Sequence, residues 1–412
     1  MSKTFRSLAN PNYRLWFSGA VPSNIGTWLQ RTAQDWLVIS ELSDHNASAV
    51  GLVVFLQFAP QIILLPITGW TVDRVDRRKL LFITQLLMSV LALILGFLVL
   101  SDHVALWQVC ACALGLGCVA AFDAPARHAF VADVVKESEL TNAVSLNSLS
   151  FNTARLVGPA IAGLLLAWVG AGWVFLINAV SFIPLLIALH LLKARMPVRA
   201  LDDSPENKKS TANFLDGFRY IARHPAMRVQ VIMTFLICSL GMNFAVYLSS
   251  MTVHVFDGHA AQYGMLISIM AIGSVMGAMV TANRSKPTML FLTLAASGFA
   301  VSSAVAALSP NFICFTIALV VLGLCLQMFM TSSNTLIQLS TDRRYRGRVM
   351  AVLLATGMGG TALGGPVVGA VSDLLGARWG IGIGSIFGLV AAALGFWFMR
   401  QQSTSKGRMS RP

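Results

Sequence analysis

The sequence alternates long apolar runs with short, charge-dense turns, and this alternation constrains the fold more than any other feature. Residues 48–67 and 80–100 are almost free of charge, and each run has about the 20 residues that a helix needs to span a bilayer. The segment 69–79 between them is rich in acidic and basic residues, which cannot enter hydrocarbon. The pattern therefore predicts two membrane helices joined by a tight turn at the membrane surface.

The same pattern continues along all 412 residues. Charged residues make up 11% of the chain, whereas soluble domains carry about a quarter. We expect an all-α integral membrane protein with twelve transmembrane helices. The predicted spans are 15–40, 48–70, 80–101, 104–124, 142–169, 172–192, 227–256, 261–281, 288–308, 311–333, 349–374 and 378–399.

The placement of the basic residues predicts the orientation of these spans. Of the 30 lysines and arginines, 27 fall in the termini, in the turns that follow even-numbered spans or, for Arg228, at the second residue of span 7, directly after such a turn. Cytoplasmic loops carry an excess of Lys and Arg, so both termini are predicted to be cytoplasmic. Membrane orientation then explains the net charge of +13, and a nucleic-acid partner is not indicated.

A polar segment after the sixth span divides the chain. We predict an N-terminal six-helix half at 1–192, a cytoplasmic linker at 193–226, a C-terminal six-helix half at 227–400 and a basic cytoplasmic tail at 401–412. The apolar residues of 214–222 recur on one helical face, which is typical of a helix lying on a membrane surface.

The two halves repeat each other weakly. Gly158-Pro159 in span 5 corresponds to Gly365-Pro366 in span 11, at an offset of 207 residues. A repeat in the same sense after an even number of spans indicates parallel repeats, which in transporters place the substrate between the halves near the midplane. Each Gly-Pro pair also predicts a kink, because Pro frees a carbonyl and Gly permits close helix approach.

The turn after the second span carries a motif, Gly69-x-x-x-Asp73-Arg74-x-x-Arg77-Arg78. It resembles the loop 2–3 signature of the major facilitator superfamily. The resemblance implies the major facilitator fold and a gating role for these residues. A topology anchor made of basic residues is the alternative, but it does not account for the position of Asp73.

Further stretches narrow this resemblance. They are similar to the branch that contains the enterobactin exporter and the macrolide and multidrug efflux proteins, the third drug:proton antiporter group. The stretches include Asn10-Pro-Asn-Tyr-Arg-Leu-Trp16, Gly26-Thr-Trp-Leu-Gln-Arg31, Phe122-Asp-Ala-Pro-Ala-Arg127 and Arg346-Gly-Arg348. The resemblance runs from about residue 5 to residue 400. It implies export of a drug, siderophore or metabolite across a bacterial inner membrane, driven by proton entry.

In the fold that this resemblance implies, Asp73 lies near the start of span 11, around Arg348. A carboxylate at a helix start is stabilised by roughly 0.3–2 kcal/mol, and a guanidinium adds a charge-assisted hydrogen bond. We therefore predict that Asp73 and Arg348 help to hold the cytoplasmic side shut in the outward-facing state.

Charged side chains inside spans are costly and usually functional. Arg31 and Asp35 lie four residues apart on one face of span 1. They are either a self-neutralising pair that fixes helix packing, or a proton-accepting Asp35 whose charge Arg31 balances. Arg155 lies halfway along span 5 with Asn152 on the same face. It either lines the substrate cavity or packs between helices.

Other polar candidates carry similar alternatives. Asp123 and Arg127 close span 4 at its inner end, as a salt-bridged cap or as a part of the gate; Asp123 is also a second candidate for proton coupling. The remaining candidates either line the substrate cavity or form hydrogen bonds between helices. These are Gln57 and Gln61 on one face of span 2, and Asn243 and Tyr247 on one face of span 7.

The sequence offers little support for an enzyme. The loops carry no nucleotide-binding or nucleophile motif, and the six cysteines fall inside apolar runs without disulfide or metal spacing. We expect a monomer without cofactor, nucleotide or metal, whose partners are a small-molecule substrate, protons and the lipid bilayer. An importer or uncoupled facilitator of the same fold, and a membrane sensor that does not transport, remain alternatives.

Overall fold

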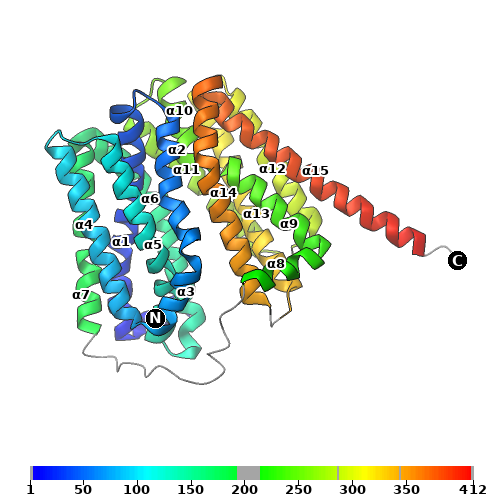
Figure 1. Ribbon diagram of the computed structural model, residues 1–412, viewed down its shortest axis with the longest axis horizontal. Helices are drawn as coiled ribbons and strands as arrows, with labels where there is room; N and C mark the ends of the chain where they lie inside the picture. The colour runs from blue at the N-terminus through cyan, green and yellow to red at the C-terminus, as the bar shows by residue number, and fades with distance from the viewer. Residues whose placement is uncertain (1–2, 193–213, 285–286, 343–344, 410–412) are drawn as a thin grey trace. The chain divides into compact units, whose positions relative to one another are not determined.

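The computed structural model is almost entirely helical (Figure 1) and describes residues 3–192, 214–284, 287–342 and 345–409. The first half contains a 3₁₀ turn η1 (Lys3–Ala9), α1 (Pro11–Leu37), a π-helical turn η2 (Val38–Leu42), α2 (Ala47–Ile63), α3 (Leu65–Arg74), α4 (Arg77–Leu100), α5 (Leu106–Val134), α6 (Glu137–Ser181) and α7 (Ile183–Leu192). The second contains α8 (Phe214–Arg223), α9 (Pro225–Gly241), α10 (Phe244–His254), α11 (Ala260–Ala282), α12 (Met289–Leu308), α13 (Phe312–Ser340), α14 (Arg346–Leu375) and α15 (Ala377–Met409).

Nine helical segments within the described ranges are long and apolar enough to cross a membrane. One of them, Glu137–Leu192, has 56 residues and contains the predicted spans 5 and 6, which are separated by Gly170 at a φ of 79°. Predicted span 2 is divided into α2 and α3 at Leu64, and predicted span 7 into α9 and α10 at residues 242–243. Such breaks could not be predicted from the length of the apolar runs, because the residues at each break are as apolar as their neighbours or lie within a run of about 20 residues.

Polar side chains mark the points where helices begin. The Asp76 carboxylate accepts hydrogen bonds from the backbone N–H groups of Arg78 and Lys79, at 2.9 and 3.2 Å. Asn10 and Asn311 cap α1 and α13 in the same way. Because such a cap satisfies otherwise unpaired amides of the first turn, α4 begins inside the charged turn 69–79.

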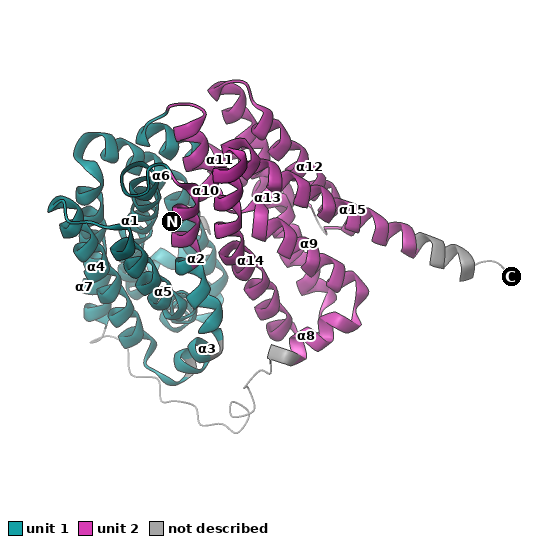
Figure 2. Cartoon of the chain, turned by 45° about the horizontal axis from the view of Figure 1, so that its top comes forward, with its two compact units in different colours: residues 1–45, 56–208, 258–268 teal, residues 46–55, 209–257, 269–412 magenta. Residues whose placement is uncertain are grey.

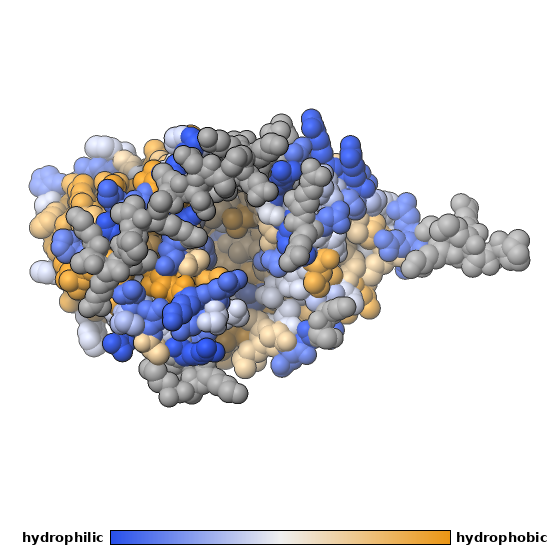
Figure 3. Space-filling model, turned by 90° about the horizontal axis from the view of Figure 1, so that it is seen from below, coloured by the Kyte–Doolittle hydropathy of each residue, from blue (hydrophilic) through white to orange (hydrophobic). Residues whose placement is uncertain are grey.

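The surface is consistent with a lipid environment along the helices. Trp107, Trp168 and Leu308 expose 70%, 79% and 79% of their surface. Hydrophilic side chains cover much of the face shown in Figure 3, and hydrophobic side chains are prominent on its left flank. Large exposed apolar areas of this kind are rare in soluble monomers.

The chain divides into two compact units (Figure 2). Unit 1 comprises residues 1–45, 56–208 and 258–268. In it, α1 packs along α6 and α7, and α4 packs along α5 and α6. The Trp16 and Phe130 rings meet edge to face at 5.0 Å in its core.

Unit 2 comprises residues 46–55, 209–257 and 269–412. In it, α12 packs on α13 and α15, and α9 packs on α14 and α15. The surface helix α8 lies against the start of α14, where a Cβ on Gly217 would be 2.7 Å from the carbonyl oxygen of Arg348. The linker residues 193–213 that precede α8 lie outside the described residues, whereas the predicted amphipathic segment coincides with α8.

Both Gly-Pro pairs lie where two helices cross closely. In unit 2, a Cβ on Gly51 of α2 would be 2.3 Å from the carbonyl oxygen of Gly365. In unit 1, a Cβ on Gly264 of α11 would be 2.2 Å from the carbonyl oxygen of Pro159. Small residues allow helix backbones to approach in this way, so both pairs serve as crossing points.

The tightest crossing gives a test of packing. A Cβ on Gly364 would lie 1.4 Å from the carbonyl oxygen of Ser239, so Gly364→Ala forces α9 and α14 apart. We expect this substitution to lower stability by about 1–3 kcal/mol, measured as a lower melting temperature in detergent.

The matched control is Gly357→Ala on the same helix, because a Cβ there meets its nearest atom at 3.7 Å. We expect this control to keep or raise the melting temperature, since Ala favours a helix over Gly by about 1 kcal/mol. Equal melting temperatures for the two variants would contradict the close-crossing interpretation.

Candidate functional site

A polar cavity of about 40 Å³ lies inside unit 1, with room for about three water molecules. Helices α1, α2, α4, α5 and α6 contribute to its wall. The lining residues are Thr27, Gln30, Arg31, Gln34, Gln57, Gln61, Met88, Leu116, Gly117, Ala120, Asn178 and Phe182. The wall carries five carboxamides and one guanidinium, which is unusual for the interior of an apolar bundle.

The α1 side of the wall holds unpaired amides. Gln30 and Gln34 are 3% and 0% exposed, and Gln30 Nε2 and both amide atoms of Gln34 have no hydrogen-bond partner within the described part of the chain. Asn178 Nδ2 donates to Gln30 Oε1. Buried polar atoms are costly unless they are hydrogen-bonded, so this wall suits a polar occupant such as water or a polar group of a ligand.

Arg31 reaches the cavity between two aromatic rings. Its guanidinium carbon lies 5.3 Å from the Trp28 ring centroid and 5.7 Å from the Phe58 ring centroid. Such cation–π contacts stabilise a desolvated guanidinium by about 2 kcal/mol. The described residues show no direct ion pair between Arg31 and Asp35, so the predicted self-neutralising pair acts only through the longer-range attraction of the two charges.

Asp35 lies one turn beyond Arg31 and is 8% exposed. The Tyr263 hydroxyl of α11 donates a hydrogen bond to Asp35 Oδ2 at 3.2 Å, and Trp36 stacks on the Tyr263 ring at 5.8 Å. All of these residues belong to unit 1. Asp35 is therefore a buried carboxylate held by one hydroxyl and near one guanidinium.

The structure places two other predicted residues in the same wall. Gln57 and Gln61 are both 8% exposed, and Gln61 Nε2 donates to the carbonyl oxygen of Gln57 at 2.9 Å. Gly117 allows α5 to approach α2 here, since a Cβ on Gly117 would lie 2.6 Å from that same oxygen. Gln57, Gln61 and Arg31 thus meet at one cavity.

Sequence reasoning missed four residues around Arg31 and Asp35. Gln30 and Gln34 share the helical face of Arg31, and a stripe of amides in an apolar span is a signal that could have identified them. Asn178 and Tyr263 come from distant parts of the chain, 148 and 228 residues from their partners, so no local pattern could have placed them.

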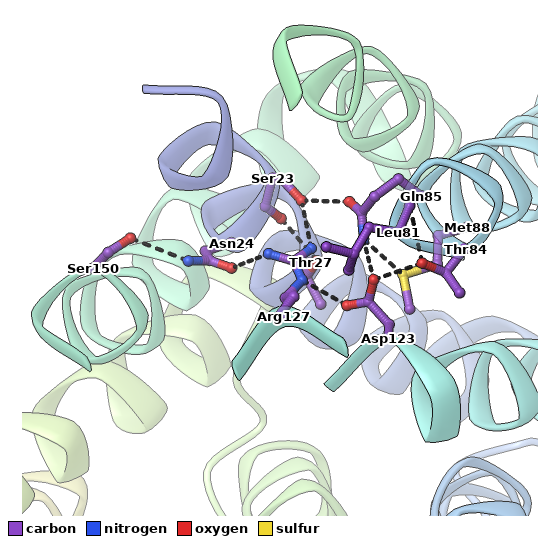
Figure 4. A network of polar contacts seen from close by, with 10 residues as sticks. All are labelled: Ser23, Asn24, Thr27, Leu81, Thr84, Gln85, Met88, Asp123, Arg127 and Ser150. Atoms are coloured by element: carbon purple, nitrogen blue, oxygen red, sulfur yellow. Dashed lines mark hydrogen bonds and ion pairs between the residues drawn. The ribbon is translucent and has the colours of Figure 1, made fainter. Parts of the chain in front are cut away.

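A second polar network surrounds Asp123 in unit 1 (Figure 4). Asp123 Oδ1 accepts hydrogen bonds from Thr84 Oγ1 at 2.8 Å and Gln85 Nε2 at 2.6 Å. Its Oδ2 accepts from Arg127 Nε at 2.6 Å. Three donors from two helices converge on one carboxylate, so the network ties α4 to α5.

Arg127 extends this network toward α1 and α6. Its Nη1 donates to Asn24 Oδ1 and its Nη2 to Ser23 Oγ, both at 3.2 Å. Asn24 Nδ2 in turn donates to Ser150 Oγ at 3.1 Å, as Figure 4 shows. The predicted salt bridge between Asp123 and Arg127 is present, and α5 continues beyond the pair to Val134. Buried partners satisfy both charges and allow the helix to continue past them.

The arginines of the signature motif have separate contacts. Arg77 Nη1 lies 2.9 Å from Asp133 Oδ2, and Arg74 lies over the Trp70 ring at 4.7 Å. Arg78 Nη1 donates to the carbonyl oxygen of Leu189 at 3.4 Å. The motif therefore links the α3–α4 turn to the ends of α5 and α7.

The predicted contact of Asp73 cannot be followed, because its side chain lies outside the described residues. A Cβ on Gly69 would meet no atom of the described residues within 4 Å, so packing within this part of the chain does not explain the glycine. Arg348 forms an ion pair with Asp216 of α8 at 3.3 Å. Arg348 is thus engaged by the surface helix in this structure.

Two of the predicted cavity residues lie elsewhere on α6. Arg155 is half-buried and Asn152 is exposed, with its Nδ2 donating to the carbonyl oxygen of Ser148 at 2.9 Å. Neither residue lines the polar cavity of unit 1.

Asn243 and Tyr247, predicted on one face of span 7, lie one helical turn apart, since the Tyr247 backbone N–H donates to the Asn243 carbonyl oxygen at 3.3 Å. Asn243 lies in the break between α9 and α10. Its Nδ2 donates to the carbonyl oxygen of Ser239 at 2.7 Å, and the Tyr247 hydroxyl donates to that of Gly241 at 3.3 Å. Both side chains are buried in unit 2 and compensate for backbone hydrogen bonds that the break removes.

Comparison with known proteins gives a consistent picture. A family model described as transmembrane secretion effector matches residues 2–411. The chain is 25% identical to the staphyloferrin A transporter of Staphylococcus aureus (strain NCTC 8325 / PS 47), covering 88% of this chain and 90% of that one. It is 24% identical to the enterobactin exporter EntS of Shigella flexneri, covering 81% and 79%. It is 26% identical to the multidrug efflux pump Tap of Mycolicibacterium fortuitum, covering 85% and 88%.

Solved structures share the fold. A bacterial homolog of the human lysosomal transporter Spinster, inward-facing and unoccupied, aligns with a TM-score of 0.75 at 15% identity, covering 95% of this chain and 97% of that one. A bacterial homologue of the iron transporter ferroportin, also inward-facing, aligns with a TM-score of 0.71 at 14% identity, covering 94% and 98%. At these identities the likeness concerns the fold alone.

The Asp123 network yields a stability prediction. Removing one partner of a buried ion pair costs about 3–5 kcal/mol, so Asp123→Asn and Arg127→Gln should each lower the free energy of unfolding in detergent. Combined, the two substitutions should cost less than the sum, with a coupling of about 1–3 kcal/mol.

Asp216 and Arg219 on α8 provide the control cycle, because they are 3.7 Å apart and the Arg219 side chain is 72% exposed. Exposed pairs of this kind couple by less than about 1 kcal/mol. Simple additivity in the Asp123–Arg127 cycle would contradict the assignment of this pair as a structural tie.

Proposed function

Because this chain belongs to the transmembrane secretion effector family of the major facilitator superfamily, we propose that it exports a small organic molecule across a bacterial inner membrane. Relatives named as siderophore transporters and as a drug efflux pump support this direction and this class of substrate. We further propose twelve spans in two six-helix halves at 1–192 and 227–400, with both termini in the cytoplasm, acting as a monomer.

The observation that supports a transport site best is the cavity of unit 1. Gln30 and Gln34, whose amides include three atoms without a hydrogen-bond partner among the described residues, and the guanidinium of Arg31 line a space of about 40 Å³. This volume suits one polar group of a substrate, or a few waters, rather than a whole drug-sized molecule. We infer that the cavity recognises one polar end of the substrate while the rest lies outside it.

We propose that Asp35 is the group that exchanges protons. It is a carboxylate buried within a span, and such groups in membrane proteins commonly belong to proton relays. Among the described residues its partners are the Tyr263 hydroxyl and the charge of Arg31 one turn away. Protonation of Asp35 removes the negative charge that balances Arg31, so it changes the electrostatics of the cavity wall directly.

Alternating access would be controlled at the signature motif. The Arg77–Asp133 ion pair and the Arg78–Leu189 hydrogen bond hold the α3–α4 turn to the ends of α5 and α7 within unit 1. In this proposal Asp73 gates the cytoplasmic side together with Arg348, which must then leave Asp216 of α8 during the cycle. A proton gradient would shift the balance between the two states, since a few kcal/mol suffices to do so.

The role of Asp35 can be tested in inverted membrane vesicles. The assay compound is the metabolite that accumulates in cells lacking the gene, found by untargeted comparison with wild type. We expect Asp35→Asn to abolish the proton-driven concentration of this compound and to leave exchange of labelled for unlabelled compound in place, because only the coupling is lost.

Asp102→Asn is the matched control for this experiment, since Asp102 is exposed in the turn between α4 and α5. If Asp35→Asn vesicles still concentrate the compound and lose this ability when a protonophore is added, Asp35 is not the coupling group. Asp123 would then be the next candidate.

Arg155 gives a separate test of the export proposal. We propose that it lines the substrate path in span 5, where a guanidinium offers a planar set of donors that a lysine cannot copy. Arg155→Ala and Arg155→Lys should both lower transport by about tenfold or more. This factor corresponds to the loss of one hydrogen bond to a charged group, which contributes about 1.5–3 kcal/mol. Arg219→Ala on the exposed α8 surface is the control. Normal transport by Arg155→Ala at normal abundance would rule this role out.

A further inference from the structure

Three sulfur atoms meet in unit 2 where predicted span 7 breaks. Cys238 Sγ lies 3.4 Å from Met242 Sδ and 3.9 Å from Met330 Sδ. Cys238 is in the last turn of α9, and Met242 is the residue that ends this helix. Met330 comes from α13. The helix break and α13 therefore place one thioether each within 3.9 Å of the same thiol.

The sulfur separations match a three-coordinate metal site. Metal–thiolate bonds are about 2.3 Å long, and three such bonds at 120° separate the ligand sulfurs by about 4 Å. The Cys238–Met330 separation of 3.9 Å is close to this value, and the Cys238–Met242 separation of 3.4 Å is about 0.6 Å shorter. A small movement of the Met242 side chain would complete the arrangement.

One glycine of α14 leaves limited room beside the thiol. A Cβ on Gly357 would lie 3.7 Å from Cys238 Sγ, an ordinary contact distance, whereas Gly360 packs closely on α9, with a Cβ there 3.2 Å from Cys238 Cβ. The two methionines are partly exposed, whereas Cys238 is fully buried. A cation would thus meet the thioethers first and the thiol last.

We propose that Cys238, Met242 and Met330 bind Cu(I). Thiolate and thioether sulfurs are soft ligands that select Cu(I) among the biological cations. One thiolate and one monovalent cation form a neutral group, which costs far less in a low-dielectric interior than a net charge. Zn²⁺ would leave a positive charge and lacks a fourth ligand, and Ca²⁺ and Mg²⁺ require oxygen ligands.

Binding is a ligand exchange without electron transfer. The Cys238 thiol loses its proton to solvent, the thiolate forms a bond to Cu(I), and each Met sulfur donates a lone pair. Cu(I) remains Cu(I), and affinity falls at low pH because the proton competes for the thiolate. The bound ion would join the break between α9 and α10 to α13. This site is independent of the proposed export function. The spacing of the cysteines in the sequence does not reveal it, because two of its three proposed ligands are methionines.

The test measures Cu(I) binding to the full-length protein in detergent under anaerobic, reducing conditions. The probe is Cu(I) supplied as its bathocuproine disulfonate complex, whose absorbance falls as the protein withdraws the metal. We expect one Cu(I) per chain for the wild type. Cys238→Ser should weaken binding by more than about 100-fold, and Met242→Leu and Met330→Leu by about 10- to 100-fold each.

Two matched controls lie on α13 close to Met330. Met328→Leu and Cys325→Ser remove a thioether and a thiol that are not part of the cluster, so both variants should bind as the wild type does. Binding that is absent, or equal in all variants, would overturn the proposal and leave the sulfurs as packing groups of the core.

A spectroscopic measurement on the wild type keeps the proposal testable if a variant fails to fold. X-ray absorption at the copper edge should show a Cu(I) centre with three sulfur neighbours. Nitrogen or oxygen neighbours, or fewer than three sulfurs, would contradict the assignment. Because neither experiment measures transport, failure here would leave the export proposal untouched.

Discussion

A polar group inside a membrane bundle must find a partner, because no water is present to replace it, and this constraint organises the interior of the protein. Asp123 meets it fully: Thr84, Gln85 and Arg127 all donate to its carboxylate. The amides of Gln30 and Gln34 on α1 meet it only in part, since Gln30 Nε2 and both amide atoms of Gln34 have no hydrogen-bond partner among the described residues and these side chains line the cavity. The first arrangement suits a fixed tie between helices, and the second suits an exchangeable occupant.

The sequence was most informative about the helices themselves. The predicted spans 80–101 and 288–308 correspond closely to α4 (Arg77–Leu100) and α12 (Met289–Leu308), because a run of apolar residues of bilayer length has few other stable states. The breaks at Leu64 and Asn243 could not be predicted in this way. A break depends on which tertiary contacts replace the lost backbone hydrogen bonds, and those contacts come from distant segments.

The candidate site shows the same division. Arg31, Asp35, Gln57 and Gln61 stood out because polar residues in apolar spans are rare, and three of them line one cavity. Tyr263 was not predicted as a site residue, because tyrosines are common near the ends of membrane spans. It also lies 228 residues from Asp35 in the sequence, so no local pattern indicates their contact. The sequence predicted the Asp123–Arg127 pair but not the extent of α5, which runs on to Val134, because the partners Thr84 and Gln85 that make a buried carboxylate acceptable there lie on another helix.

The break in span 7 illustrates how packing turns a local irregularity into a defined structure. Gly364 brings α14 against the carbonyl of Ser239, and Asn243 Nδ2 donates to the same carbonyl. The break is therefore held by a close crossing and by a side chain that replaces a backbone donor. At such a break, the contacts of the helix crossing set the orientation of a side chain, and the helical periodicity of the sequence does not predict it. Met242 consequently meets Cys238, which also meets Met330, and any motion that straightens α9 into α10 must change the distance between Met242 and the thiol.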